Sequence, residues 1–382
     1  MSTPKDAIKQ LLGRLLCLFS RRECIVFEST PDFSDNTYPV FLEMCQRGLD
    51  EKYTFVWSCS QRTPLPGQPK NIRYIYPKEN SLVQKLRTAY YMANAKCMVC
   101  CNRFLLPWRK EQLSFFLTHG TPIKNIRGYY TLPGSISYCL SASAALSEHT
   151  AFQHGFDPQK MFALGFPRND ILTQPTADVK KALQTECSKV IVWYPTFRQH
   201  HNGLTAGSGK ALPVIHDTTA AIALNEWAVQ QNVLLVLKPH FAQNVSQIKD
   251  LQLSNIRFID DSFFTQNALS SYAFVSGCDA LITDYSSIYF DYTLCDKPIG
   301  LVWEDLEEYR SNPGFALDID ECGKGGVKIY NLDDFKEFIR QVAQGEDPCC
   351  EQRRALRDTV NYAPDGNNTK RVTEYIIQHA SL

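Results

Sequence analysis

The chain has 382 residues, of which 44% are hydrophobic, and this is ample apolar material for a large folded core. At about 150 residues per domain, such a length predicts two or three domains, and we expect two domains. Forty basic and forty acidic residues cancel, so the chain lacks the overall positive field of nucleic-acid-binding proteins. Any anion must therefore be recognised by local groups, and nucleic acid is not expected as a partner.

The 14 cysteines follow neither a disulfide nor a zinc spacing. Cys97, Cys100 and Cys101 lie in the apolar run AKCMVCC, where thiols serve as small buried hydrophobic groups. Cys349 and Cys350 are adjacent and do not supply the second Cys-x-x-Cys pair of a zinc site. This usage predicts a reducing, cytoplasmic compartment and no bound metal.

An amphipathic helix is predicted between residues 7 and 19, within a membrane-contacting segment of residues 1–20. Its apolar stripe comprises Ile8, Leu11, Leu12, Leu15, Leu16 and Phe19, and the neighbouring basic residues are Lys9, Arg14, Arg21 and Arg22. The segment is too short and too charged to span a bilayer. Two interpretations remain open: a helix lying on anionic lipid, or an ordinary helix packed on its own domain.

Short β-rich runs alternate with helical patterns along the rest of the chain. The first series of predicted strands is 24–27, 53–57, 72–76, 96–101 and 113–117, and the second is 190–194, 233–237, 256–259, 280–283 and 299–303, with helices at 218–231 and 334–343. Such alternation predicts parallel sheets covered by helices. Because a polar stretch with two prolines separates the series at residues 166–178, we predict two Rossmann-like domains, residues 21–170 and 171–382.

The run DALITDYSSIYFDY predicts an anion site. An apolar strand leads through Thr283 and Asp284 into a helix that begins near Ser286 and Ser287. The first N–H groups of a helix have no partner within the helix, and together with the serine hydroxyls they are suitable donors to a phosphate. The alternative is that Ser286 and Ser287 only cap the helix.

Three further predicted strands end at a proline close to a cation or a histidine. The run THGTPIK carries His119 and Lys124, YPTFR carries Arg198, and LKPH carries Lys238 and His240. For His119 the alternative is a satisfied histidine in a loop, and for Arg198 it is a surface arginine paired with a carboxylate. Because ligands of open α/β sheets bind beyond the carboxyl ends of the strands, we expect these ends and the serine turn to converge on one cleft between the domains. Their shared chemistry is phosphate binding together with a titratable base.

Together these motifs resemble the CDP-glycerol glycerophosphotransferase family, which includes the teichoic acid primases and polymerases. The matching runs are THGTPIK (118–124), GFPRNDIL (165–172), YPTFR (194–198), LKPH (237–240), DALITDYSSIYFDY (279–292), KPIGLV (297–302) and DGNNTKRV (365–372). They occur in the family's order between residues 118 and 372. Residues 1–111 carry none of its motifs.

The resemblance implies a GT-B arrangement, in which two Rossmann-like domains face each other across a cleft and the C-terminal one holds the nucleotide. It implies inverting, metal-independent transfer of glycerol phosphate from CDP-glycerol to a hydroxyl of a lipid-linked glycan or poly(glycerol phosphate) acceptor, with release of CMP and without a cofactor. Members act in teichoic acid or capsule-type polymer synthesis on the cytoplasmic face of the cell membrane. This favours the membrane interpretation of the N-terminal helix.

Site roles follow from positions within the family's motifs. His119 matches the histidine proposed to deprotonate the acceptor hydroxyl, and His240 matches the one expected to hold the pyrophosphate. The donor phosphate site corresponds to Arg198, Lys238, Thr283, Asp284, Ser286 and Ser287, and the residues beside His119 that are predicted to contact acceptor or phosphate are Gly120, Thr121 and Lys124. Members often read Lys-x-His-Pro where this chain has Lys238-Pro239-His240, which alters the orientation expected of His240.

Several alternatives stay open. CDP-ribitol is a close relative of the proposed donor, and a GT-B glycosyltransferase would need contacts to sugar hydroxyls instead of a phosphate set at Arg198 and His240. An idle nucleotide-binding subunit would need no base, so the retention of both His119 and His240 argues against it. Because the N-terminal half carries no acceptor motif, the sequence separates neither primase from polymerase nor wall polymer from capsule.

Overall fold

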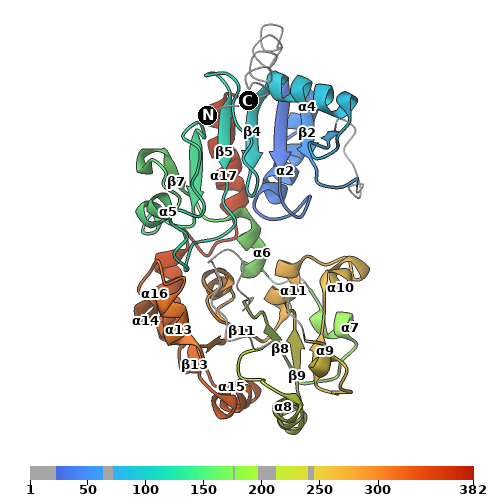
Figure 1. Ribbon diagram of the computed structural model, residues 1–382, viewed down its shortest axis with the longest axis vertical. Coiled ribbons are helices and arrows are strands. Elements are labelled where there is room, and N and C mark those ends of the chain that lie inside the picture. The colour runs from blue at the N-terminus through green and yellow to red at the C-terminus, as the bar shows by residue number, and fades with distance from the viewer. Residues whose placement is uncertain (1–22, 63–71, 175–176, 197–211, 240–244) are drawn as a thin grey trace. The chain divides into compact units, whose positions relative to one another are not determined.

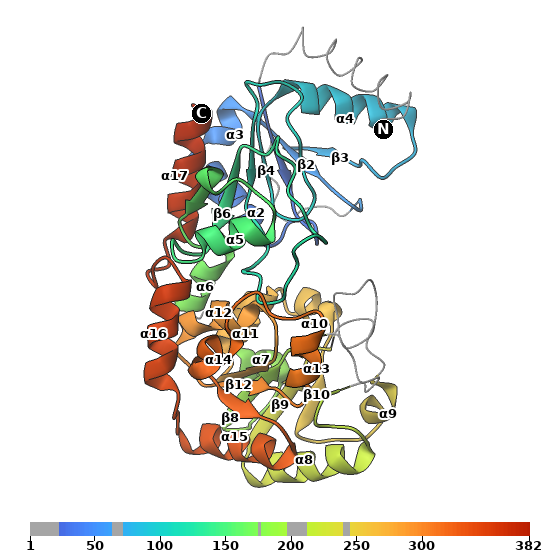
Figure 2. The same ribbon diagram turned by 60° about the vertical axis from the view of Figure 1, so that its left-hand side comes forward.

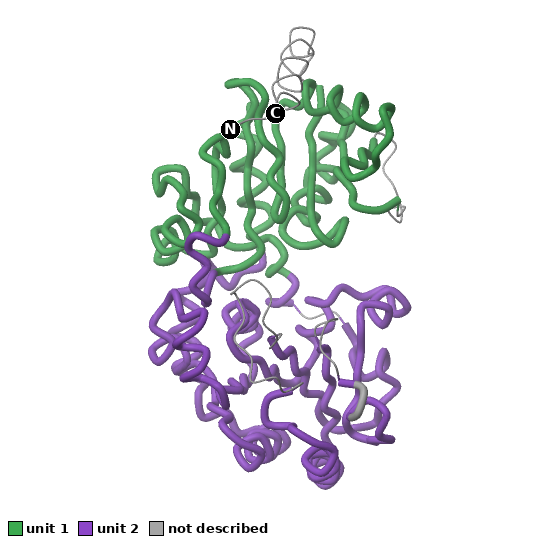
Figure 3. The backbone as a smooth tube through the Cα atoms, in the orientation of Figure 1, with its two compact units in different colours: residues 1–121, 130–170, 367–382 green, residues 122–129, 171–366 purple. Residues whose placement is uncertain are grey.

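The computed structural model describes residues 23–62, 72–174, 177–196, 212–239 and 245–382. The chain forms two compact units, coloured separately in Figure 3, which we describe one at a time. Unit 1 runs to Thr121 and includes Tyr130–Asp170 and Asn367–Leu382, whereas unit 2 comprises Pro122–Tyr129 and Ile171–Gly366. The predicted domain of residues 171–382 therefore differs from the structure at its end, because the last helix belongs to unit 1.

Unit 1 is built on a seven-stranded parallel sheet in the order β3-β2-β1-β4-β5-β6-β7 (Figure 1). Its strands are β1 (Cys24–Glu28), β2 (Thr54–Ser58), β3 (Ile72–Ile75), β4 (Ala95–Cys100), β5 (Leu113–Phe116), β6 (Tyr138–Ser141) and β7 (Met161–Ala163). Its helical segments are α2 (Thr37–Gln46), α3 (Leu49–Lys52), α4 (Leu82–Asn94), α5 (Ser147–Gln153), η1 (Pro158–Lys160), η2 (Pro167–Asn169) and α17 (Asn368–Ala380). Apart from Glu28 at the end of β1 and the partly buried Lys96 of β4, these two inner strands are apolar and buried, as expected of a sheet covered on both faces.

The C-terminal helix α17 packs against α2 in unit 1, and both lie on the same side of the sheet (Figure 2). Tyr375 of α17 stacks on Phe162 of β7, with ring centroids 4.3 Å apart and planes only 5° apart. Val372 and Ile376 of the same helix are fully buried. These contacts make the last helix part of the core of unit 1.

Unit 2 contains a six-stranded parallel sheet in the order β10-β9-β8-β11-β12-β13. Its strands are β8 (Lys189–Trp193), β9 (Val233–Leu237), β10 (Ile256–Phe258), β11 (Ala280–Thr283), β12 (Ile299–Val302) and β13 (Val327–Ile329). The helical segments are α7 (Val179–Leu183), α8 (Thr218–Gln230), α9 (Ser246–Lys249), α10 (Asp261–Gln266), α11 (Ser271–Gly277), α12 (Ile288–Tyr292), η3 (Thr293–Cys295), α13 (Leu306–Ser311), α14 (Ile319–Cys322), η4 (Gly323–Gly325), α15 (Leu332–Gln344) and α16 (Cys350–Val360). The short helix α6 (Asp170–Thr173) spans the point where the chain passes from unit 1 to unit 2.

The predicted α/β class with two parallel sheets is confirmed. Every strand predicted from the sequence is present, with ends shifted by at most one residue, and the helices predicted at 218–231 and 334–343 are α8 and α15. The strands β6, β7 and β13, each of three or four residues, were not predicted from the sequence. The helix predicted at 7–19 lies outside the described residues.

The cysteine run behaves as predicted, since Cys97, Cys100 and Cys101 are fully buried in or beside β4. Burial raises the pKa of the Cys97 thiol from 9.0 to about 12, so this group stays neutral. Over the described part of the chain, no helix combines the length and the apolar character needed to cross a bilayer.

Candidate active site

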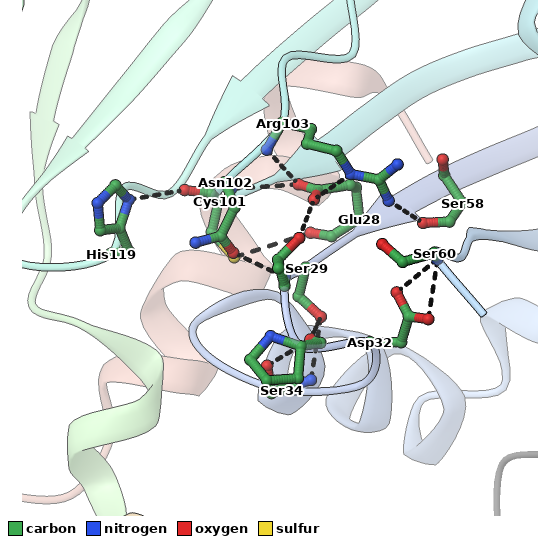
Figure 4. A network of polar contacts seen from close by, with 12 residues as sticks. Glu28, Ser29, Asp32, Ser34, Ser58, Ser60, Cys101, Asn102, Arg103 and His119 are labelled. Atoms are coloured by element: carbon green, nitrogen blue, oxygen red, sulfur yellow. Dashed lines mark hydrogen bonds and ion pairs between the residues drawn. The ribbon is translucent and has the colours of Figure 1, made fainter. Parts of the chain in front are cut away.

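His119 follows β5 at the carboxyl edge of the sheet in unit 1. The strand ends because buried Thr118 takes a left-handed backbone conformation with φ of +50°, and Gly120 also has a positive φ, of +139°. His119 itself is exposed, and its Nδ1 lies 3.2 Å from the carbonyl oxygen of Cys101 (Figure 4). Because a carbonyl oxygen only accepts hydrogen bonds, this contact selects the tautomer protonated at Nδ1. In this neutral tautomer the lone pair lies on Nε2, as a general base requires.

A buried carboxylate holds the loop that carries the Cys101 carbonyl. Glu28, at the end of β1, is fully buried, and its carboxylate accepts hydrogen bonds from the backbone N–H groups of Asn102 at 3.1 Å and Arg103 at 2.9 Å. The Arg103 guanidinium forms an ion pair with the same carboxylate at 3.1 Å and donates to the Ser58 carbonyl (Figure 4). The orientation of His119 therefore depends on a fixed network. The role of Glu28 was not predicted from the sequence, although a glutamate at the end of the apolar run CIVFE was a visible signal.

The other residues predicted beside His119 differ in their surroundings. Gly120 is half-buried and Thr121 is buried in unit 1. Lys124 belongs to unit 2, where it pairs with Phe315 in a β-bridge and its Nζ lies 5.7 Å from the centre of the Tyr309 ring. Contact of these three residues with an acceptor stays a prediction.

Three of the four predicted strand ends lie side by side in the sheet of unit 2. Val236 of β9 and Leu281 of β11 both pair with Val192 of β8, and these strands are neighbours in the sheet. Two residues further along each strand, Lys238, Tyr194 and Thr283 therefore stand at one level of the carboxyl edge. The strand end of His119 belongs to the other sheet.

Thr283 and Asp284 join the end of β11 to the end of β8. The Thr283 hydroxyl donates to the Tyr194 carbonyl at 3.0 Å. The Asp284 carboxylate accepts the backbone N–H of Thr196 at 2.8 Å, the Thr196 hydroxyl, and the N–H of Tyr285 at 2.7 Å. Both side chains are buried and bonded to protein groups. Their evident role is to shape the edge, and direct contact with a donor stays a prediction.

Ser286 and Ser287 are half-buried at the start of α12. Ser287 occupies the N-cap position, but its side chain makes no capping hydrogen bond. Within the described residues, neither serine hydroxyl has a hydrogen-bond partner, so the capping interpretation does not account for them. Because α12 has only five residues, the hydroxyl and N–H groups, rather than a long helix dipole, are the donors that an anion would meet here.

Lys238 lies at the same edge as the serine turn. Its Nζ pairs with Asp261 at 3.0 Å and lies 5.9 Å from the centre of the Tyr194 ring. This ion pair keeps a cation directly beyond β9. Arg198 and His240, the other predicted phosphate ligands, lie outside the described residues.

A hollow of about 550 Å³ adjoins this edge, where β12 and β13 end. It is lined by Trp303, Glu304, Asp305, Leu306, Glu307, Glu308 and Tyr330. Glu304 is bonded to His216 at 2.5 Å and to the backbone N–H of Val214, while Asp305 accepts the Tyr285 hydroxyl at 3.0 Å. Tyr285 thus links the hollow to the serine turn. This hollow was not predicted from the sequence, although the acidic and aromatic run WEDLEEY follows an apolar strand and was a visible signal.

Residues 12–378 match the family described as CDP-Glycerol:Poly(glycerophosphate) glycerophosphotransferase. The teichoic acid poly(glycerol phosphate) polymerase of Bacillus spizizenii is 26% identical over 403 residues, covering 97% of this chain and 96% of that protein. Two longer relatives are the teichoic acid poly(glycerol phosphate) polymerase of Bacillus subtilis, 23% identical, and the teichoic acid poly(ribitol-phosphate) polymerase of Bacillus spizizenii, 26% identical. They are matched over 94% and 80% of this chain, which spans 49% and 48% of their respective lengths.

The wall teichoic acid polymerase TagF has a similar structure. The TM-score is 0.73 at 20% sequence identity, and the match covers 99% of this chain and 95% of that one. At this identity the likeness establishes a shared fold.

Proposed function

Since the chain belongs to the CDP-glycerol:poly(glycerophosphate) glycerophosphotransferase family, we propose that it transfers glycerol phosphate from CDP-glycerol to a hydroxyl of a lipid-linked acceptor. The acceptor is a glycan or a poly(glycerol phosphate) chain of a teichoic acid or capsule-type polymer. The observation that carries the proposal is the exposed His119, whose Nδ1 is held by the Cys101 carbonyl so that Nε2 is free to accept a proton.

In the proposed reaction the acceptor oxygen attacks the phosphorus that bears the glycerol. The bond from this phosphorus to the bridging oxygen breaks, and CMP leaves with that oxygen. The proton of the acceptor hydroxyl passes to Nε2 of His119. Hydrogen-bond donors and cations beside the pyrophosphate stabilise the charge that develops on the leaving phosphate.

We assign the donor to the carboxyl edge of unit 2. The hydroxyls of Ser286 and Ser287, with Lys238 at the same edge, provide donors for the pyrophosphate, and Arg198 and His240 are proposed to complete this set. The exposed aromatic ring of Tyr330, which lines the hollow, suits a cytosine base. Carboxylates of the hollow are acceptors for the cytosine amino group and the ribose hydroxyls, and they would repel a pyrophosphate, which sets the direction of the nucleotide.

The working enzyme is proposed to be of GT-B type, with the base on unit 1 and the donor on unit 2. We also propose a peripheral position on the cytoplasmic face of the cell membrane, where lipid-linked acceptors occur. A row of exposed apolar side chains on α4 supports this: Leu82, Val83, Leu86 and Tyr90 are 71%, 70%, 60% and 55% exposed. Lys85 and Arg87 lie on the same helix and suit anionic lipid.

The test is to incubate the full chain with CDP-glycerol, CDP-ribitol or UDP-sugars and a synthetic lipid-linked acceptor, and to measure release of CMP or UDP. CMP release with CDP-glycerol supports the proposal. A preference for CDP-ribitol would favour the second candidate function, transfer of ribitol phosphate, to which the similarity to a poly(ribitol-phosphate) polymerase points. His119→Ala should lower the rate about 10²- to 10⁴-fold while CDP-glycerol still binds, as for the loss of a general base. Wild-type turnover by this variant would remove His119 from the proposal.

A further inference from the structure

Two family motifs without an assigned role, GFPRNDIL and DGNNTKRV, lock together in unit 1. The Asp170 carboxylate accepts the backbone N–H groups of Asn368 at 2.9 Å and Thr369 at 2.8 Å, at the start of α17. In return, the Asn368 side chain donates to the Phe166 carbonyl and the Thr369 hydroxyl donates to the Pro167 carbonyl, each at 3.2 Å. We call this set of four hydrogen bonds the clasp. It joins segments about two hundred residues apart in the sequence.

The clasp leaves no room for a side chain at Gly165. This glycine has φ of +80°, and a Cβ atom there would lie 2.2 Å from Oδ1 of Asn368. A side chain would therefore have to displace the asparagine that bonds to Phe166. Arg371 donates to the same Oδ1 and to the Leu164 carbonyl, which further fixes the start of α17.

Arg168 extends from the clasp to the loop of His119. Its Nη1 donates to the His119 carbonyl oxygen at 2.9 Å and forms an ion pair with Asp35 at 2.7 Å. The side chains of Arg168 and Asp35 are only 10% and 14% exposed, so solvent screens this pair weakly. The guanidinium is therefore shared between a carboxylate at the start of α2 and the backbone of the candidate base.

Asn36 supports the same loop from the neighbouring position. It is fully buried, and its Nδ2 donates to the carbonyls of Leu117 and Thr118, both at 3.1 Å. Its Oδ1 accepts the backbone N–H of Arg168 at 3.2 Å. Asn36 and Arg168 thus bind the three successive carbonyls of residues 117–119. Such support is needed because Thr118, a β-branched residue, has a positive φ that is costly in an unrestrained loop.

We propose that Arg168 is a positioning residue for the reaction, which sets the place of the His119 backbone and so the direction of its imidazole. This inference rests on the proposed role of His119 as the base. The Cys101 carbonyl fixes the ring, and Arg168 fixes the backbone from which the ring extends. A displacement of about 1 Å in a catalytic group is enough to lower a rate about 10²-fold.

The experiment compares Arg168→Lys with a matched control, Arg47→Lys, in the full chain. Arg47 pairs with Glu43 at 2.9 Å and with Glu374 at 2.6 Å beyond the other end of α2, so its replacement disturbs a similar contact of the same helix. Arg168→Lys keeps the charge but loses the planar fork. We expect it to lower kcat about 10- to 100-fold, with CDP-glycerol affinity by calorimetry unchanged, and we expect wild-type kcat from Arg47→Lys.

A double-mutant cycle with His119→Ala separates positioning from a general structural effect. If Arg168 acts through His119, Arg168→Lys should not lower further the residual CMP release of His119→Ala. An equal fold-loss in both backgrounds would overturn the inference. Wild-type activity of His119→Ala alone would instead refute the proposed function, so the two failures are distinct.

Asp35→Asn provides a second test of the same contact, which is needed if Arg168→Lys does not fold. It removes the carboxylate partner of Arg168 and leaves both motifs of the clasp intact. We expect a fall in kcat of the same kind, again absent in the His119→Ala background. The inference is overturned if Asp35→Asn has wild-type kcat and Arg168→Lys is folded and fully active. It is also overturned if Asp35→Asn has wild-type kcat and Arg168→Lys cannot be obtained as a folded protein.

Discussion

At the scale of single residues, the side chains of the serine turn are expected to contribute to donor affinity and not to folding stability. Ser286 and Ser287 make no side-chain hydrogen bond with the described residues, so replacing both by alanine should leave the melting temperature unchanged. Each lost hydroxyl contact to a charged phosphate weakens binding by about 1.5 to 3 kcal/mol. We therefore expect the double variant to bind CDP-glycerol at least about ten-fold more weakly in calorimetry.

Ser270 provides the matched control for this measurement. Its hydroxyl accepts the N–H of Ala273 and caps α11, and it belongs to the same unit. Ser270→Ala should lower stability by about 1 kcal/mol without changing donor affinity. If the double variant at 286 and 287 keeps wild-type affinity, the pyrophosphate is bound elsewhere.

His154 makes unit 1 sensitive to acid. Its ring packs against Tyr130, with centroids 5.6 Å apart, and its pKa falls from 6.5 to about 4, first because it is buried and second because His119 is nearby. The unfolded chain thus takes up a proton at this side chain near pH 6.5, and the folded chain only near pH 4. Stability should be fully present above pH 6.5 and should fall as the pH drops to 4, by about 3 kcal/mol in total.

Urea unfolding at several pH values tests this expectation. In His154→Phe the fall in stability between pH 6.5 and 4 should be smaller than in the wild type, whatever the change in stability at neutral pH. An unchanged slope in His154→Phe would show that other groups cause the acid sensitivity.

At the scale of elements, the strands that are visible as apolar runs in the local sequence were predicted correctly. The strands that form the centre of each sheet are continuous apolar runs, such as VLLVL at residues 233–237, and they were placed to within a residue. The position of α17 was not predicted, because its partners Asp170 and Phe162 are about two hundred residues away in the sequence. Glu28 was missed for the same reason, since the backbone groups that it binds lie more than seventy residues away.

The exposed face of α4 carries a prediction about membrane binding. Leu82→Gln with Leu86→Gln removes two apolar side chains that are mostly exposed, so stability should not change. Each such side chain contributes up to about 1.5 to 3 kcal/mol when it leaves water, so binding to phosphatidylglycerol vesicles should weaken at least about ten-fold in a sedimentation assay.

Two exposed apolar residues of α8 in unit 2 serve as the control for α4. Ile222 and Val229 are 43% and 48% exposed, and replacing both by serine should leave vesicle binding unchanged. Equal losses in the two double variants would mean that the effect is not specific to α4. Unchanged binding in the α4 variant would leave the predicted helix at residues 7–19 as the membrane contact.

At the scale of the whole molecule, the chain passes between its units more than once, and the sequence indicated only the passage near residue 170. The serine turn and the acidic hollow are complete within unit 2, whereas the last helix completes unit 1. Deleting residues 367–382 should therefore abolish turnover and lower the stability of unit 1, because α17 supplies the buried Val372 and Ile376 and one side of the clasp. CDP-glycerol binding should survive, because no residue of α17 belongs to the carboxyl edge of unit 2, where we propose that the donor binds.

Calorimetry with CDP-glycerol and CMP release, measured on the same truncated protein, test this division of labour. Tyr375→Ala is a milder variant that removes the stacking on Phe162 but keeps the helix, and it should lower stability with donor affinity intact. Loss of donor binding in Tyr375→Ala would show that α17 contributes to the donor site. Wild-type turnover after truncation would show that neither the clasp nor α17 is needed to hold His119 in place, since the support from Arg168 depends on both motifs.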